Sequence, residues 1–113
     1  MIHNPLYNIY IASCTNGGGI YQYHLYDDGC LKLRNFTQMD SPMYMASENN
    51  SMYILLRSPF SESKESGLVV CDISTDGKLQ APTGIISTKG EVACHLSVNC
   101  EDVYCANYIS GSV

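Results

Sequence analysis

The chain has 113 residues, 45% of them hydrophobic and 15% charged, a balance typical of a globular protein rather than a disordered one. Its net charge is −5 and its six Lys and Arg residues are widely spread, which argues against a nucleic-acid-binding surface. No basic segment with a long apolar run opens the chain, and no stretch approaches the roughly 20 apolar residues of a membrane span. We therefore expect a cytoplasmic protein without nucleic-acid or membrane partners.

Short apolar runs separated by turn residues predict β-strands along the whole chain. In chain order, the expected strands are 8–12, 19–25, 43–47, 52–56, 67–73, 78–80, 92–98 and 103–106. No segment of ten or more residues places apolar side chains at helical spacing, so almost no helix is expected. The Asp-Gly pairs at 28–29 and 76–77 predict tight hairpin turns, because glycine accepts a positive φ at little cost.

The chain also repeats itself. The segment 19–31, with its strand and Asp-Gly turn, aligns with 67–79, and 41–56 aligns without a gap with 92–107. In the second alignment Tyr44 corresponds to His95. Repeats about 40 to 50 residues long are typical of β-propellers or solenoids, and four short strands per unit favour propeller blades. The predicted fold is therefore all-β, with blades of four antiparallel strands.

We expect a single β-propeller domain over 1–113, with an incomplete first blade at 1–40, a second at 41–91 and the start of a third at 92–113. The first blade lacks its own innermost strand, which the C-terminus supplies in closed propellers of this kind. Two blades alone would leave sheet faces uncovered. We therefore expect either the N-terminal part of a longer protein or short chains that assemble into a ring. Further blades or self-association would close the fold.

One stretch resembles a known family. Cys94-His95-Leu96-Ser97-Val98, a polar turn at 99–102 and then VYCANYISGSV at 103–113 resemble the lactonase family of seven-bladed β-propellers. This family includes the propeller-type 6-phosphogluconolactonases and the 3-carboxy-cis,cis-muconate cyclases. Two positions depart from the family pattern: Ala93 stands where a proline is usual, and Leu56-Arg57 stands where an Asn-Glu-like pair is common.

The resemblance implies a hydrolase that acts on a small-molecule sugar-acid lactone without a metal or organic cofactor. The first expectation is 6-phosphogluconolactonase activity, in carbohydrate metabolism and the pentose phosphate pathway. A muconate-type lactonising enzyme, which is a cycloisomerase, is one alternative. A non-enzymatic propeller that serves as a binding scaffold is the other, because propeller architecture alone does not specify catalysis.

Four residues are candidates for the site. His95 is the catalytic candidate, because an imidazole on an inner strand can carry a proton near neutral pH. A hydrogen-bonded structural histidine is the alternative, and the family's main catalytic residues are expected beyond residue 113. Arg57, Asn107 and Tyr108 follow or end strands and are candidates for substrate binding. The alternatives are a solvated Arg57 and a turn-capping role for Asn107 and Tyr108.

Six cysteines occur in the chain, and Cys71, Cys94 and Cys105 lie inside apolar runs, which favours buried free thiols over disulfides. Cys94, Cys100 and Cys105 stand near His95, but without a Cys-x-x-Cys pair no metal site is expected. The histidines His3 and His24 are isolated from other candidate ligands, so neither is assigned a role.

Overall fold

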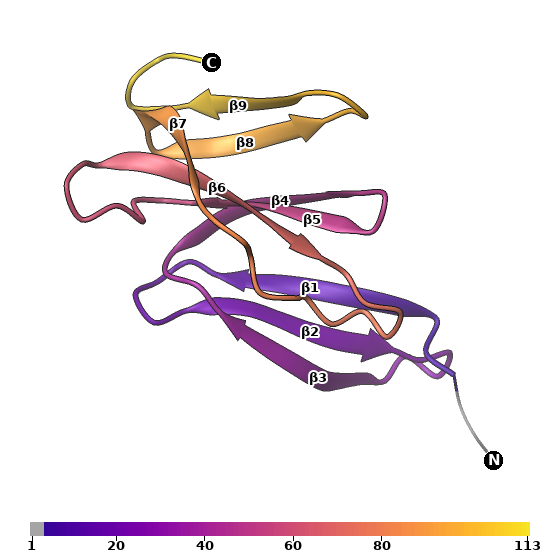
Figure 1. Ribbon diagram of the computed structural model, residues 1–113. Helices are drawn as coiled ribbons and strands as arrows, with labels where there is room; N and C mark the ends of the chain where they lie inside the picture. Colours follow the sequence, from indigo (N-terminus) through magenta and orange to yellow (C-terminus); the bar gives the residue numbers. More distant parts are fainter. Residues whose placement is uncertain (1–3) are drawn as a thin grey trace.

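A computed structural model describes residues 4–113 as nine β-strands in three antiparallel sheets, with no helix in that range (Figure 1). The strands are β1 (Tyr7–Ser13), β2 (Gly19–Leu25), β3 (Leu31–Gln38), β4 (Pro42–Glu48), β5 (Ser51–Leu56), β6 (Glu65–Asp72), β7 (Ile86–Glu91), β8 (Ala93–Val98) and β9 (Val103–Asn107). The sheet orders are β1-β2-β3, β4-β5-β6-β7 and β8-β9. The all-β prediction is confirmed. His3 lies outside the described residues.

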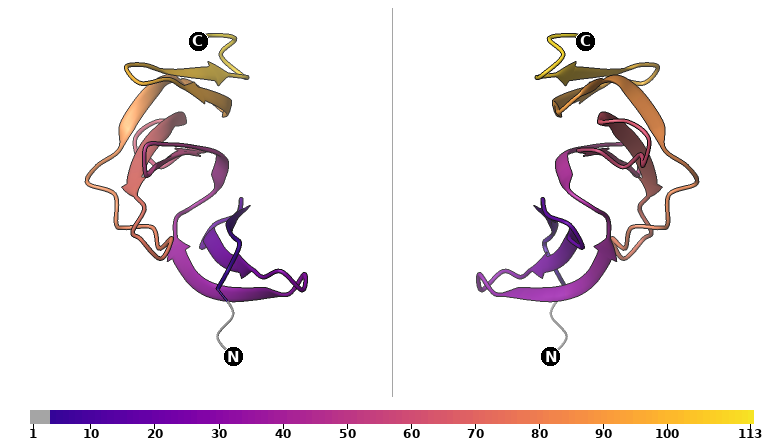
Figure 2. Two further views of the ribbon diagram at one scale, coloured as in Figure 1. Left: turned by 90° about the vertical axis from the view of Figure 1, so that its right-hand side faces the viewer. Right: turned by 90° about the vertical axis from the view of Figure 1, so that its left-hand side faces the viewer.

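The three sheets follow one another along an arc, with β4 on its concave side and β7 on its convex side (Figure 2). The described chain measures 52 × 31 × 24 Å. Its radius of gyration is 15.0 Å, against about 13 Å for a compact domain of similar length. The sheets are therefore stacked side by side as successive blades rather than folded around one central core.

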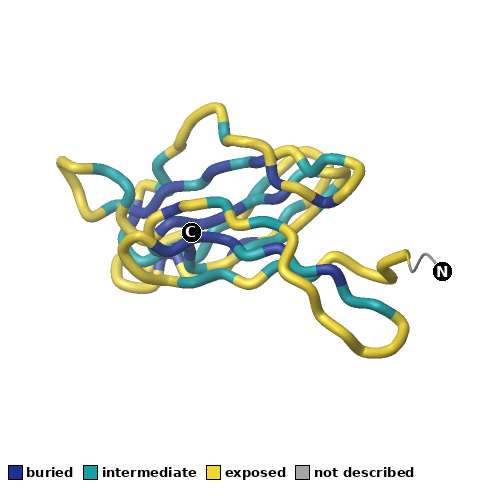
Figure 3. Tube along the Cα trace, turned by 90° about the horizontal axis from the view of Figure 1, so that it is seen from below, coloured by how far each residue is buried: buried dark blue, intermediate teal, exposed yellow. Residues whose placement is uncertain are grey.

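The core consists of two clusters, one on each face of the middle sheet. Buried residues lie along the strands, whereas most turns are exposed (Figure 3). On β5, Met52, Ile54 and Leu56 belong to the cluster shared with the first sheet, whereas Leu55 belongs to the cluster shared with the third. Successive side chains of a strand point to opposite faces. The continuous apolar run of β5 is thus buried on both faces.

The fourth strand of the middle sheet lies elsewhere than predicted. We predicted it at 78–80, but Leu79 forms only an isolated bridge with Ile73, and β7 takes the place beside β6. Pro82 follows soon after this bridge and has no N–H to donate to a ladder, and the chain leaves the sheet before it returns as β7. In the first sheet the equivalent turn, with Gly29 at a φ of 86°, does join β2 directly to β3.

The displaced turn contacts the first sheet instead. The side-chain amide of Gln22 donates to the carbonyl of Asp76 at 2.9 Å, and the Tyr10 hydroxyl donates to the carbonyl of Gly77. The ring of the buried His24 lies 3.3 Å from the same Asp76 oxygen. A Cβ added to Gly77 would lie about 2.5 Å from side-chain atoms of Gln22, so the approach is close. The turn at 74–78 therefore links the middle sheet to the first sheet through hydrogen bonds.

Candidate functional site

The four predicted site residues lie toward one end of the sheets, which we call the rim: the end where β5 and β9 finish and β4 and β8 begin. The ladders pair Pro42 with Leu56 and Ala93 with Asn107, and the Ser66 hydroxyl bridges the end of the first hairpin to the start of the second. Arg57 and Tyr108 follow directly. The sequence repeat thus brings equivalent strand ends of two blades together.

The same backbone conformation, a residue with a positive φ, precedes both inner strands, β4 and β8. Ser41 and Val92, one residue before β4 and β8, have φ values of 50° and 54°. The ladder register then shifts between Pro42 and Tyr44 and between Ala93 and His95, as at a β-bulge. Bulges redirect the side chains around them. The repeat therefore places Tyr44 and His95 in equivalent orientations on neighbouring blades.

His95 lies on β8 with an exposed side chain. Its ring faces that of Tyr44, with centroids 4.7 Å apart and an interplanar angle of 47°. The imidazole contacts the Tyr44 ring but has no hydrogen-bond partner among residues 4–113. An accessible imidazole held by a neighbouring ring can accept or donate a proton to a bound molecule.

Asn107 is 3% exposed, and its side chain is fully engaged inside the protein. Its amide oxygen accepts from the Thr88 hydroxyl at 2.8 Å, and its amide nitrogen lies 3.2 Å from both the Thr88 carbonyl and the Ser112 hydroxyl. A Cβ on Gly90 would lie 2.5 Å from this side chain. Asn107 thus joins the outer strand of one blade to the turn after β9 and fixes the backbone on which Tyr108 stands.

Tyr108 is 72% exposed, and its backbone N–H donates to the carbonyl of Val92 at 2.9 Å. The backbone of Arg57 is also fixed, because its N–H donates to Ser41 at 2.9 Å and its carbonyl accepts from the Ser66 hydroxyl at 2.8 Å. The Ser66 oxygen in turn accepts from the N–H of Ala93. The side chains of Arg57 and Tyr108 therefore extend into solvent from backbone that is fixed by hydrogen bonds.

A cavity of about 380 Å³ opens at the rim between the second and third sheets. Its lining residues are Arg57, Ser58, Lys64, Glu91, Val92 and Ile109. Lys64 and Glu91 were not among the predicted site residues, although their charges near strand ends were visible in the sequence. Their common cavity was not, because it depends on how the β5–β6 loop meets the link between β7 and β8.

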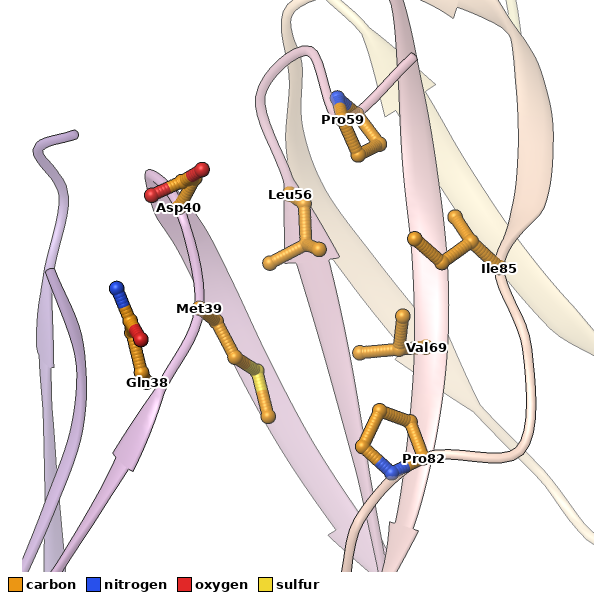
Figure 4. Close-up of a pocket in the computed structure, with 8 residues that line it drawn as sticks. All are labelled: Gln38, Met39, Asp40, Leu56, Pro59, Val69, Pro82 and Ile85. Carbon is orange, nitrogen blue, oxygen red and sulfur yellow. The ribbon is translucent and has the colours of Figure 1, made fainter. Parts of the chain in front are cut away.

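A second cavity, of about 260 Å³, lies between the first and middle sheets (Figure 4). The buried side chains of Met39, Leu56 and Val69 line it, together with Pro59, Pro82 and Ile85. Gln38 and Asp40 contribute its polar wall, and the Asp40 carboxylate accepts from the N–H of Gly17 at 2.7 Å. None of the predicted site residues lines this cavity.

The cysteines are free and differ in exposure. Cys71 is buried as predicted and Cys105 is partly so, but the prediction was wrong for Cys94, whose side chain is exposed beside the β8 bulge. Burial raises the pKa of the Cys71 thiol above its ordinary value, with a further contribution from Asp72. No group of three or more metal-ligating side chains gathers within residues 4–113. In that range, no helix is long and apolar enough to span a membrane.

Comparison with known families agrees with this geometry. A family model described as "Lactonase, 7-bladed beta-propeller" matches residues 8–113. The chain belongs to this lactonase family. The match confirms the resemblance predicted from residues 94–113 and the propeller fold, and it supports a lactonase-like function. No curated protein and no solved structure gives a significant match.

Proposed function

We propose that this lactonase-family protein hydrolyses a sugar-acid lactone, with 6-phosphoglucono-1,5-lactone as substrate and 6-phosphogluconate as product. The observation that supports this most directly is the exposed His95 ring beside Tyr44, toward the same end of the sheets as Arg57 and Tyr108. These residues come from β4, β5, β8 and β9 or follow them directly. They supply a proton carrier, a cation and a phenol on fixed backbone.

Each residue has a distinct task in this proposal. The His95 imidazole takes a proton from water as the water oxygen attacks the lactone carbonyl carbon, and the proton passes to the ring oxygen as its bond to that carbon breaks. Arg57 faces the anionic oxygens of the bound molecule, where a guanidinium forms paired hydrogen bonds. Tyr108 donates to substrate oxygens, and Asn107 contributes through the position that it gives Tyr108.

Acid release from freshly prepared 6-phosphogluconolactone tests the proposal. The protein should release acid well above the spontaneous rate, and His95→Asn should lower the rate by about a hundredfold while the thermal unfolding curve stays unchanged. 3-Carboxymuconate, supplied in a parallel assay, serves as the control for lactonising activity. A rate equal to the spontaneous rate at every protein concentration would contradict the proposal.

A further inference from the structure

The rim cavity concentrates positive charge in an acidic protein. Arg57 and Lys64 are two of only six Lys and Arg residues in a chain of net charge −5, and both line this cavity. β5 and β6 are antiparallel neighbours, with Leu56 paired to Gly67, so the two ends of the loop between them lie close together. Two cations at such a position repel each other unless an anion lies between them.

The two cations are not held in ion pairs within residues 4–113. No ion pair within 4.0 Å involves Arg57 or Lys64 in the described part of the chain, and both side chains are exposed. The one carboxylate that lines the cavity belongs to Glu91, the last residue of β7. The lining therefore carries a net charge of about +1 and offers both charged donors and a strong acceptor.

The wall that holds Glu91 is fixed by its backbone. The Glu91 N–H donates to the Ser110 hydroxyl at 2.8 Å, and its carbonyl accepts from the N–H of Ile109 at 3.2 Å. The next residue, Val92, has a φ of 54°, which a β-branched side chain rarely adopts. Backbone strain of this kind is concentrated at ligand-binding sites. The cavity thus has a preformed backbone wall at Glu91 and Val92.

We propose that Lys64 and Glu91 determine the specificity of the rim cavity for a small anion that also carries hydroxyl groups. Lys64 joins Arg57 in holding the anionic oxygens, and the Glu91 carboxylate accepts a hydrogen bond from a hydroxyl of the same molecule. A volume of about 380 Å³ is within the usual range of small-molecule sites. This inference rests on the proposed function, because it assigns these residues to recognition of the phosphorylated lactone.

Equilibrium binding to the purified protein tests the inference without catalysis. The probes are glucose 6-phosphate, gluconate, inorganic phosphate and glucose, so that phosphate, carboxylate and hydroxyl groups are separated. Lys64→Gln should weaken binding of the anionic sugar by about tenfold, and Lys64→Arg should restore it. Lys78→Gln is the matched control, because Lys78 lies in the turn at 74–78, at the opposite end of β6. Equal losses for Lys64→Gln and Lys78→Gln would overturn the inference.

Glu91→Gln tests hydroxyl recognition by Glu91 separately from anion binding by Lys64. Removal of the carboxylate should strengthen binding of inorganic phosphate and reduce the preference for glucose 6-phosphate over it. An unchanged preference would overturn the role of Glu91. If acid release occurs with the same KM in Lys64→Gln, the inference fails and the lactonase proposal stands. If the binding pattern holds but no acid is released, the proposed reaction fails and the anion site stands.

Discussion

Tyr44 and His95 occupy the same position on successive blades, and their rings lie 4.7 Å apart. Each follows a bulge on an inner strand, so the contact results from the repeat of the backbone. One blade places a phenol on its inner strand, and the next places an imidazole beside it. The tyrosine therefore limits the orientations available to the histidine.

Tyr44→Leu should lower the rate of lactone hydrolysis several-fold through loss of this ring contact, since aromatic pairs contribute roughly 0.5–1.5 kcal/mol. Tyr44→Phe keeps the ring and should retain the rate. Tyr104→Leu, an exposed tyrosine on β9, is the control. An unchanged rate in Tyr44→Leu would rule out a positioning role for Tyr44.

Val92→Asn should increase the free energy of unfolding by about 1 kcal/mol. Left-handed backbone costs an L-residue roughly 1–2 kcal/mol, and asparagine tolerates it better than a β-branched residue does. Val98→Asn is the matched control, because Val98 is also half-buried but has no positive φ. Chemical denaturation should show opposite signs for the two variants. Destabilisation of both to the same extent would mean that Val92 is unstrained.

Gly90→Ala should destabilise the protein by about 1–3 kcal/mol, because the new Cβ would lie 2.5 Å from the Asn107 side chain. The clash should also separate β7 from the turn after β9. Gly84→Ala provides the control, since a Cβ there meets no atom within 4 Å. Denaturant midpoints compare the two. Equal midpoints would show that the Asn107 side chain can move away from residue 90 at little cost in stability.

Alkylation with iodoacetamide should label the native cysteines in a definite order. Cys14, Cys94 and Cys100 are exposed and should react first. A hydrogen bond to Asp28 raises the pKa of the Cys30 thiol, so its thiolate is scarcer and its labelling slower. Cys71 should be labelled only after unfolding, which mass spectrometry of the peptides would show. Rapid labelling of Cys71 in the native protein would contradict its buried position.

Acid should weaken the turn at 74–78. Hydrogen bonds from the Ser74 hydroxyl and the Lys78 N–H lower the pKa of the Asp76 carboxyl. Because the folded pKa lies below the unfolded one, the stabilisation is present above the ordinary pKa of 3.8 and is lost as pH falls below it. The stability difference between wild type and Asp76→Asn should therefore shrink from about pH 6 to about pH 3. Glu62→Gln, on the exposed β5–β6 loop, is the control. A constant difference would argue against the ionised carboxylate as its cause.

Sequence reasoning predicted what local pattern and repetition determine. The alternating and apolar runs indicated most strands, and the two self-alignments indicated propeller blades. The alignment of Tyr44 with His95 marked the two residues as equivalent positions of two blades. It did not anticipate the contact itself, because that depends on how neighbouring blades pack.

Contacts between distant segments could not be predicted in the same way. The equal Asp-Gly turns suggested equal fourth strands, yet the second turn binds the first sheet, with Asp76 and His24 separated by 52 residues. The burial of Asn107 likewise depends on Thr88, 19 residues earlier. In both cases polar groups form hydrogen bonds to another blade. The periodicity of residues within one strand carries no information about such contacts. The cavity shared by Lys64 and Glu91 could not be predicted either, because it depends on how the β5–β6 loop meets the link between β7 and β8.

Because β5 is buried on both faces, the middle blade packs against both of its neighbours through adjacent residues of one strand. Ile54 contributes to the interface with the first blade and Leu55 to the interface with the third, although the two residues are adjacent. Ile54→Ala should therefore speed hydrogen exchange in β1–β3, and Leu55→Ala should do so in β8 and β9. Cooperativity then passes from blade to blade as between nearest neighbours in a linear array. A disturbance in the first blade can thus reach the third through the middle blade, where β5 contacts both neighbours.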